Sequence, residues 1–96
     1  MTKEADRDAQ ALASREKGRS FVKIAALLGY DSANDAVQAY KRALLRKTPE
    51  EQATLRAAER KRFDTMAKKV RGDAALSKAE AAKRLARIDR LRTALG

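Results

Sequence analysis

Three polar side chains recur at helical spacing near the middle of the chain, and their types could read nucleic-acid bases. Asn34, Gln38 and Lys41 follow an i, i+4, i+7 pattern, which places them on one face of a helix. Asn and Gln can form two hydrogen bonds with adenine, and Lys can reach guanine. We therefore expect at least two of these side chains to contact base edges in double-stranded DNA. The alternative is an ordinary solvated helix face.

Basic residues flank this pattern and suit the DNA phosphates. The cations expected there are Arg19, Lys23, Arg42, Arg46 and Lys47. Contacts of this kind position a protein without specifying a sequence, and they make affinity depend on salt. Asp31 and Asp35 repel phosphate, so they are expected to cap a helix or to accept from cytosine amino groups.

Two short helices joined by a turn are predicted to position these side chains. Ser20 can cap a helix whose apolar face is Phe21, Ile24, Ala25 and Leu28. Gly29 can adopt the left-handed backbone of a sharp exit, and Ser32 can cap the next helix. That helix, 33–46, is expected to bury Ala33, Val37, Tyr40 and Leu44. The segment 20–45 therefore predicts a DNA-binding helix-turn-helix, with a protein-binding helical bundle as the alternative.

Helices are also expected on both sides of this segment. The first spans about 3–17, buries Ala5, Ala9, Leu12 and Ala13, and ends at Gly18. Thr48, Pro49 and Glu51 form a helix start, predicting a helix that runs to about Arg71. Gly72 ends this helix, and Asp73 is expected to cap the last one, from about Ala74 to Leu95. The predicted fold is all-α: a three-helix helix-turn-helix domain over 1–47 and an antiparallel helical hairpin over 48–96.

The hairpin is expected to assemble copies of the chain. Its apolar positions form thin stripes, and two helices with such stripes are not expected to be stable alone in water. The residues expected at the oligomer interface are Phe63, Met66, Val70, Leu85, Ile88 and Leu91. The basic residues of the same two helices indicate either a solvated face or a second DNA contact.

The composition narrows the classes of function. The 96 residues carry 23 Lys and Arg against 13 Asp and Glu, a net charge of +10 that suits a polyanionic partner. The chain has no Cys and no His, so zinc sites and His-based catalysis are not expected. No paired carboxylates lie near a nucleophile and no phosphate-binding loop follows a strand, so neither an enzyme nor a cofactor is expected. The chain lacks a signal peptide and a membrane span, which predicts a cytoplasmic protein.

Two segments together resemble the small terminase subunits of tailed phages, particularly those of actinobacteria. The first is GRSFVKIAALLGYDSANDAVQAYKRALLRK, in which a Gly-Tyr-Asp-Ser turn leads into a polar and basic helix. The second is RFDTMAKKVRGDAALSKAEAAKRLARIDRLRTALG, in which a Gly-Asp turn leads into a long helix with the pattern Arg-Ile-x-Arg-Leu. The likeness covers about residues 18–96.

This resemblance implies a role in viral genome packaging, performed in the host cytoplasm. Small terminase subunits recognise packaging-site DNA, assemble into rings and recruit the large, catalytic subunit. Carried over by position, the residues at the DNA would be Ser32, Asn34, Gln38, Lys41 and Arg42. Two alternatives remain: a dimeric helix-turn-helix transcriptional regulator, and a structural adaptor whose basic charge is incidental.

Overall fold

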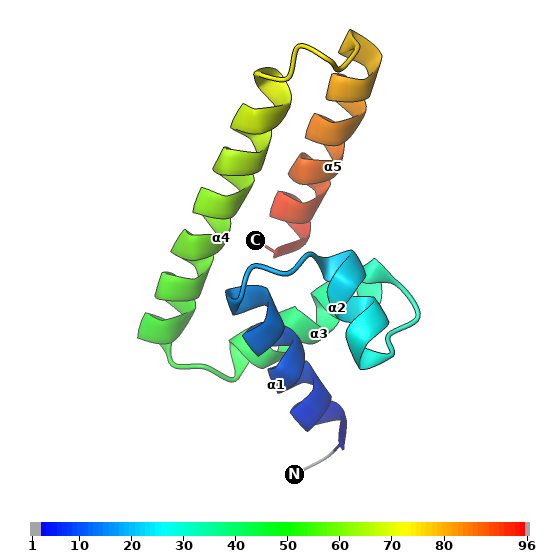
Figure 1. Cartoon of the computed structure of the whole chain (residues 1–96). Helices are drawn as coiled ribbons and strands as arrows, with labels where there is room; N and C mark the ends of the chain where they lie inside the picture. Colours follow the sequence, from blue (N-terminus) through cyan, green and yellow to red (C-terminus); the bar gives the residue numbers. More distant parts are fainter. Residues whose placement is uncertain (1–2, 96) are drawn as a thin grey trace. The chain divides into compact units, whose positions relative to one another are not determined.

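Five α-helices make up the regular structure of residues 3–95, the part of the chain that the computed structural model describes (Figure 1). They are α1 (Lys3–Glu16), α2 (Phe21–Leu28), α3 (Ala33–Leu45), α4 (Pro49–Arg71) and α5 (Lys78–Leu95). No strand occurs within this range, so the predicted all-α class is confirmed. Residues 1, 2 and 96 of the predicted domains lie outside the described residues.

The chain forms two compact units, Met1–Gln52 and Ala53–Gly96, called here the N-terminal and C-terminal units. The division falls near the start of α4, whereas the sequence placed the domain boundary after Lys47. A side-chain hydrogen bond joins the start of α4 to the preceding segment, because Gln52 Nε2 donates to the carbonyl oxygen of Lys47 at 2.9 Å. The first turn of α4 is thereby tied to the end of the N-terminal unit.

The N-terminal unit is a bundle in which each of α1, α2 and α3 packs against the other two. Its aromatic core pairs Phe21 of α2 with Tyr40 of α3, with ring centroids 5.8 Å apart and planes inclined at 77°. The Arg15 guanidinium lies 4.2 Å above the Phe21 ring and donates to the Arg19 carbonyl oxygen at 3.0 Å. These contacts connect α1 to the short helix α2 and, through the rings, to α3.

The buried face of α1 differs from the one expected. The side chains it buries are Asp8, Ala11, Leu12 and Arg15. Of the predicted face, Leu12 is buried and Ala5 is half-buried, whereas Ala9 and Ala13 are exposed, so the prediction is wrong for these two alanines. The reason is that Asp8 and Arg15 are hydrogen-bonded, which offsets the cost of removing their charges from water.

The start of α4 follows the sequence prediction closely. The Glu51 N–H donates to Thr48 Oγ1 at 3.2 Å, and the Thr48 hydroxyl donates to Glu51 Oε1 at 3.0 Å. This reciprocal pair satisfies a free N–H of the first turn and fixes the helix start at Pro49. The helix ends at Arg71, as expected, and the Gly72 N–H donates to the Lys68 carbonyl oxygen at 3.0 Å.

Helix α5 begins at Lys78, later than the predicted Ala74. Asp73 does not cap it. Its carboxylate accepts from the Ala75 N–H at 3.0 Å, which makes a local turn instead. The cap is Ser77, whose Oγ accepts from the Glu80 N–H at 3.1 Å.

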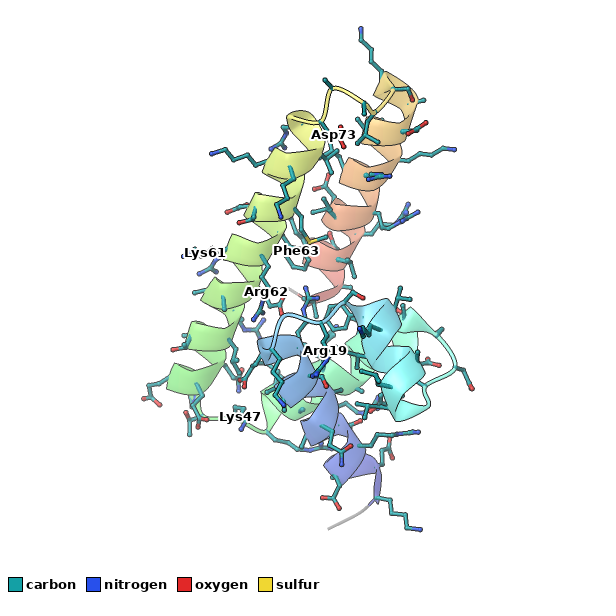
Figure 2. The ribbon with its side chains drawn as sticks, viewed as in Figure 1. Arg19, Lys47, Lys61, Arg62, Phe63 and Asp73 are labelled. Atoms are coloured by element: carbon teal, nitrogen blue, oxygen red, sulfur yellow. The ribbon has the colours of Figure 1, made fainter. Side chains whose placement is uncertain are left out.

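Within the C-terminal unit, α4 and α5 run in opposite directions (Figure 1). Arg92 Nη2 of α5 lies 2.7 Å from Asp64 Oδ1 of α4, and Arg56 Nη1 donates to the Leu95 carbonyl oxygen at 3.3 Å. Figure 2 shows Phe63 on the side of α4 that faces α5 and Lys61 on the opposite side. Neither these nor the other helices within residues 3–95 are long and apolar enough to cross a membrane.

Candidate nucleic-acid interface

The turn between α2 and α3 sets the direction of α3. Gly29 has φ +76°, and its N–H and that of Tyr30 both donate to the carbonyl oxygen of Ala25. A Cβ at Gly29 would meet no atom within 4 Å, so the backbone conformation and not space calls for glycine here. Ser32 Oγ then accepts from the Asp35 N–H at 3.1 Å and caps α3. The left-handed Gly29 and the Ser32 cap were both expected from the sequence.

Helix α3 has one buried side and one accessible side. Its buried side chains are Ala36, Val37, Ala39, Tyr40, Ala43 and Leu44. The accessible side, called here the outer face of α3, consists of Asn34, Gln38, Lys41 and Leu45. Asn34 and Leu45 are exposed, while Gln38 and Lys41 are half-buried.

The polar members of the outer face have no partner within the described chain. Among residues 3–95, the side chains of Asn34, Gln38 and Lys41 form no hydrogen bond or ion pair. Their amide and ammonium groups are therefore available to an external partner. The structure brings these three predicted base-reading residues onto one surface.

Arg42 and Arg46 lie beside this face but are engaged with an acid of α1. Arg42 Nε and Nη2 donate to the two Asp8 oxygens at 2.9 and 3.0 Å, and Arg46 Nη1 donates to Oδ2 at 3.4 Å. The Tyr30 hydroxyl donates to Asp8 Oδ1 at 3.2 Å. We call these four residues the Asp8 cluster. Their contacts join α1, the turn and α3, so these two arginines hold the bundle together.

Charge and burial compete at the centre of this cluster. The Asp8 side chain is 0% exposed, and burial by itself would raise its pKa. The hydrogen bonds and charge of Arg42, with bonds from Tyr30 and Arg46, outweigh that effect and hold the pKa of Asp8 below its ordinary value. Burial and the Asp8 charge raise the pKa of Tyr30, so its hydroxyl remains a donor at neutral pH. The cluster therefore contains an ionised carboxylate at physiological pH.

A polar hollow of about 510 Å³ opens between α1, the turn and α3. Its lining residues are Arg7, Gly29, Tyr30, Asp31, Asp35, Gln38 and Arg42. The Arg7 guanidinium lies 4.3 Å above the Tyr30 ring. Two arginines and two aspartates share the lining, so this hollow has no strong net attraction for a phosphate.

The other residues expected at phosphates come from separate segments. Lys23 is exposed on α2, and Lys47 Nζ lies 4.0 Å from Glu51 Oε2. Arg19 is half-buried, with Nη1 donating to Ser14 Oγ at 3.5 Å (labelled in Figure 2). The Ser32 hydroxyl is used in the cap of α3. The outer face of α3 therefore groups three of the predicted contacts, Asn34, Gln38 and Lys41, on one surface.

The six residues expected at an oligomer interface divide by exposure. Phe63 and Ile88 are 2% and 3% exposed, so the single chain already covers them. Val70, Leu85 and Leu91 are half-buried, and Met66 is 42% exposed. Of these six residues, Met66, Val70, Leu85 and Leu91 therefore leave apolar surface accessible, whereas Phe63 and Ile88 do not.

Charge is divided unequally between the two units. The N-terminal unit has 10 Lys and Arg against 8 Asp and Glu, whereas the C-terminal unit has 13 against 5. The sequence prediction placed the principal DNA contacts in the N-terminal segment, but most of the net positive charge lies in the other unit.

Comparison with known proteins adds no relative: no family model, curated protein or solved structure matches the chain.

Proposed function

We propose that this chain is a non-enzymatic DNA-binding protein that reads base edges with the outer face of α3. The observation that carries the proposal is the contrast between the two sides of α3. One side is buried against α1 and α2, while the other presents Asn34, Gln38 and Lys41 without intramolecular partners. Two amides and an ammonium are the groups that recognise adenine and guanine in the major groove.

The proposed binding unit is a helix-turn-helix with α3 as its recognition helix. In this motif the first helix crosses the DNA backbone, and residues near the start of the second contact bases. Asn34 lies in the first turn of α3, directly after the Ser32 cap. A helix of 13 residues is about 20 Å long and fits a major groove about 12 Å wide.

Within this proposal, the Asp8 cluster supports the reading helix and does not itself read DNA. Arg42 and Arg46 donate hydrogen bonds to Asp8, and these bonds hold α1 against α3. Lys23, whose side chain is exposed and has no partner among residues 3–95, is then the predicted phosphate contact that remains free. Arg19 and Lys47 are proposed as weaker contacts, because each already has an intramolecular partner.

The resemblance to small terminase subunits supplies the proposed biological role. We propose that the chain recognises packaging-site DNA of a tailed phage, assembles through its C-terminal unit and recruits a large terminase subunit. Half-exposed and exposed apolar side chains on α4 and α5 support an assembly surface there. Several weak DNA-reading units in one oligomer would gain affinity through a high effective concentration.

The test of DNA reading is a paired substitution with a matched control. We expect Gln38→Ala/Lys41→Ala to weaken binding to duplex DNA by tenfold or more, since a good base contact contributes about 1–3 kcal/mol. Gln10→Ala/Lys17→Ala changes the same residue types at exposed positions of the same unit and should leave affinity unchanged. Fluorescence anisotropy measures affinity, and circular dichroism checks helicity. Equal affinity of both folded variants and the parent would contradict the proposal.

A further inference from the structure

Helix α5 has a row of cations on the side opposite its buried residues. Lys83, Arg87 and Arg90 follow an i, i+4, i+7 pattern, and all three are exposed. Ile88 and Leu95, which mark the buried side, are 3% and 7% exposed. We call Lys83, Arg87 and Arg90 the α5 basic stripe.

The stripe is not neutralised within the chain. None of its side chains forms a hydrogen bond or ion pair with any of residues 3–95. Asp89, one of the two acids of α5, lies 4.0 Å from Arg92 Nε instead. Seven residue steps separate the first charge from the last, a rise of about 10 Å, so the three charges repel one another when no anion is bound.

Other arginines of the same unit are arranged differently. Arg92 is paired with Asp64, Arg62 with Glu59, and Arg56 donates to the Leu95 carbonyl oxygen. The C-terminal unit therefore contains cations that are paired within the unit and cations that face solvent. The second group accounts for its large positive charge.

We propose that the α5 basic stripe binds the phosphate backbone of duplex DNA without regard to sequence. Arginine presents a planar fork of N–H groups that suits phosphate oxygens, and evenly spaced cations suit a regular row of phosphates. The N-terminal unit supplies little of this attraction, because its charges nearly cancel and Asp8 occupies Arg42 and Arg46. The stripe is thus a second surface, beyond the base reading assigned to α3.

An anionic membrane is the less favoured partner for this surface. Helices that bind membrane surfaces insert an apolar face between the lipids. Of the large apolar side chains of α5, Ile88 and Leu95 are buried and Leu85 and Leu91 are half-buried, so none is fully exposed for insertion. A duplex backbone requires only the exposed cations.

The test measures how the affinity for duplex DNA of random sequence depends on salt. Lys83→Gln/Arg87→Gln/Arg90→Gln should reduce the slope of log K against log[salt] by about 2 to 3, and each lost contact should weaken binding about eightfold at 0.1 M salt. Arg60→Gln/Lys61→Gln/Lys78→Gln is the control, since it removes the same charge from exposed, unpaired positions outside the stripe. The control should retain a slope close to that of the parent.

Three outcomes would overturn the stripe as a DNA contact. The first is a stripe variant whose salt slope equals that of the parent. The second is an equal loss of slope in the control variant. The third is a stripe variant that loses binding to phosphatidylserine vesicles but keeps the parent's affinity for DNA. The Gln38→Ala/Lys41→Ala variant, measured on the same duplex, separates the two proposals. If only Gln38→Ala/Lys41→Ala loses affinity for DNA, the stripe proposal is rejected and the α3 proposal is kept. If only the stripe variant loses affinity, the α3 proposal is rejected and the stripe proposal is kept.

Discussion

Asp8 is a fully buried acid that forms ion pairs with two arginines of the N-terminal unit. A fully buried carboxylate accepts from Arg42, Arg46 and Tyr30, and so joins three segments that are distant in the sequence. The arginine side chains are 41% and 52% exposed, so they can return to water when the acid is removed. The cost of losing Asp8 is therefore moderated by their solvation.

We expect Asp8→Asn to lower the free energy of unfolding by about 2 kcal/mol at neutral pH, because it removes a charge that two arginines share. Urea denaturation followed by circular dichroism measures the change. Asp6→Asn is the matched control, since Asp6 is an exposed acid of the same helix, and it should have little effect. Equal stability of the two variants would show that the Asp8 cluster does not stabilise the fold.

The same carboxylate predicts a dependence of stability on pH. Burial alone raises the pKa of Asp8, but Arg42 and its other partners bring it below the ordinary value of 3.8. Its contribution to stability is therefore complete above the unfolded pKa and is lost as pH falls through the folded one. We expect the parent to lose stability below about pH 4, and Asp8→Asn to lose less over that range. Parallel pH profiles of the two proteins, measured by urea denaturation, would contradict this.

The Asp8 cluster could not be predicted from local sequence patterns. Periodicity favoured the small alanines of α1 as its buried face, because a charged residue is ordinarily placed in solvent. The partners of Asp8 lie more than 20 residues away, at Tyr30, Arg42 and Arg46. The outer face of α3 was predictable because helical spacing alone separates Asn34, Gln38 and Lys41 from the apolar residues between them.

At the scale of elements, capping residues predicted most helix boundaries. Ser20, Ser32 and Thr48 all act as expected, and Gly29 has the left-handed backbone that its turn requires. The start of α5 was misplaced because Asp73 and Ser77 are both suitable caps, and Asp73 comes first. Its carboxylate bonds to the Ala75 N–H within the connecting turn, which leaves the cap to Ser77.

We expect Ser77→Ala to reduce the stability of the C-terminal unit by about 1 kcal/mol, because the Glu80 N–H loses its acceptor. Asp73→Ala should have a smaller effect, since it removes a turn contact that precedes the helix. Thermal unfolding followed by circular dichroism compares the two variants. A larger loss for Asp73→Ala would place the start of α5 where the sequence first suggested.

Assembly of the whole chain is a prediction, and the exposure of the expected interface residues decides which substitution can test it. Phe63→Asp would place a charge in a site that the single chain already buries, so it would disturb the fold itself. Met66 is 42% exposed on the same helix and offers a cleaner test.

We expect Met66→Glu to lower the mass of the oligomer in solution, because it places a charge in the proposed apolar contact. Val22→Glu is the control: Val22 is 71% exposed but lies in α2, outside the proposed assembly surface. Light scattering gives the mass directly. A ring favours the terminase role and a dimer favours a transcriptional regulator, whereas a monomeric parent would remove the proposed assembly.

Titration of duplex DNA into the isotope-labelled chain, followed by nuclear magnetic resonance, shows residue by residue whether the outer face of α3 contacts DNA. We expect the largest chemical-shift changes at the side-chain amides of Asn34 and Gln38 and at the backbone around Lys41. Gln10 and Gln52, which carry the same amide group elsewhere in the N-terminal unit, should shift little. If the resonances of Asn34 and Gln38 stay unshifted at saturating DNA, the outer face of α3 does not bind DNA.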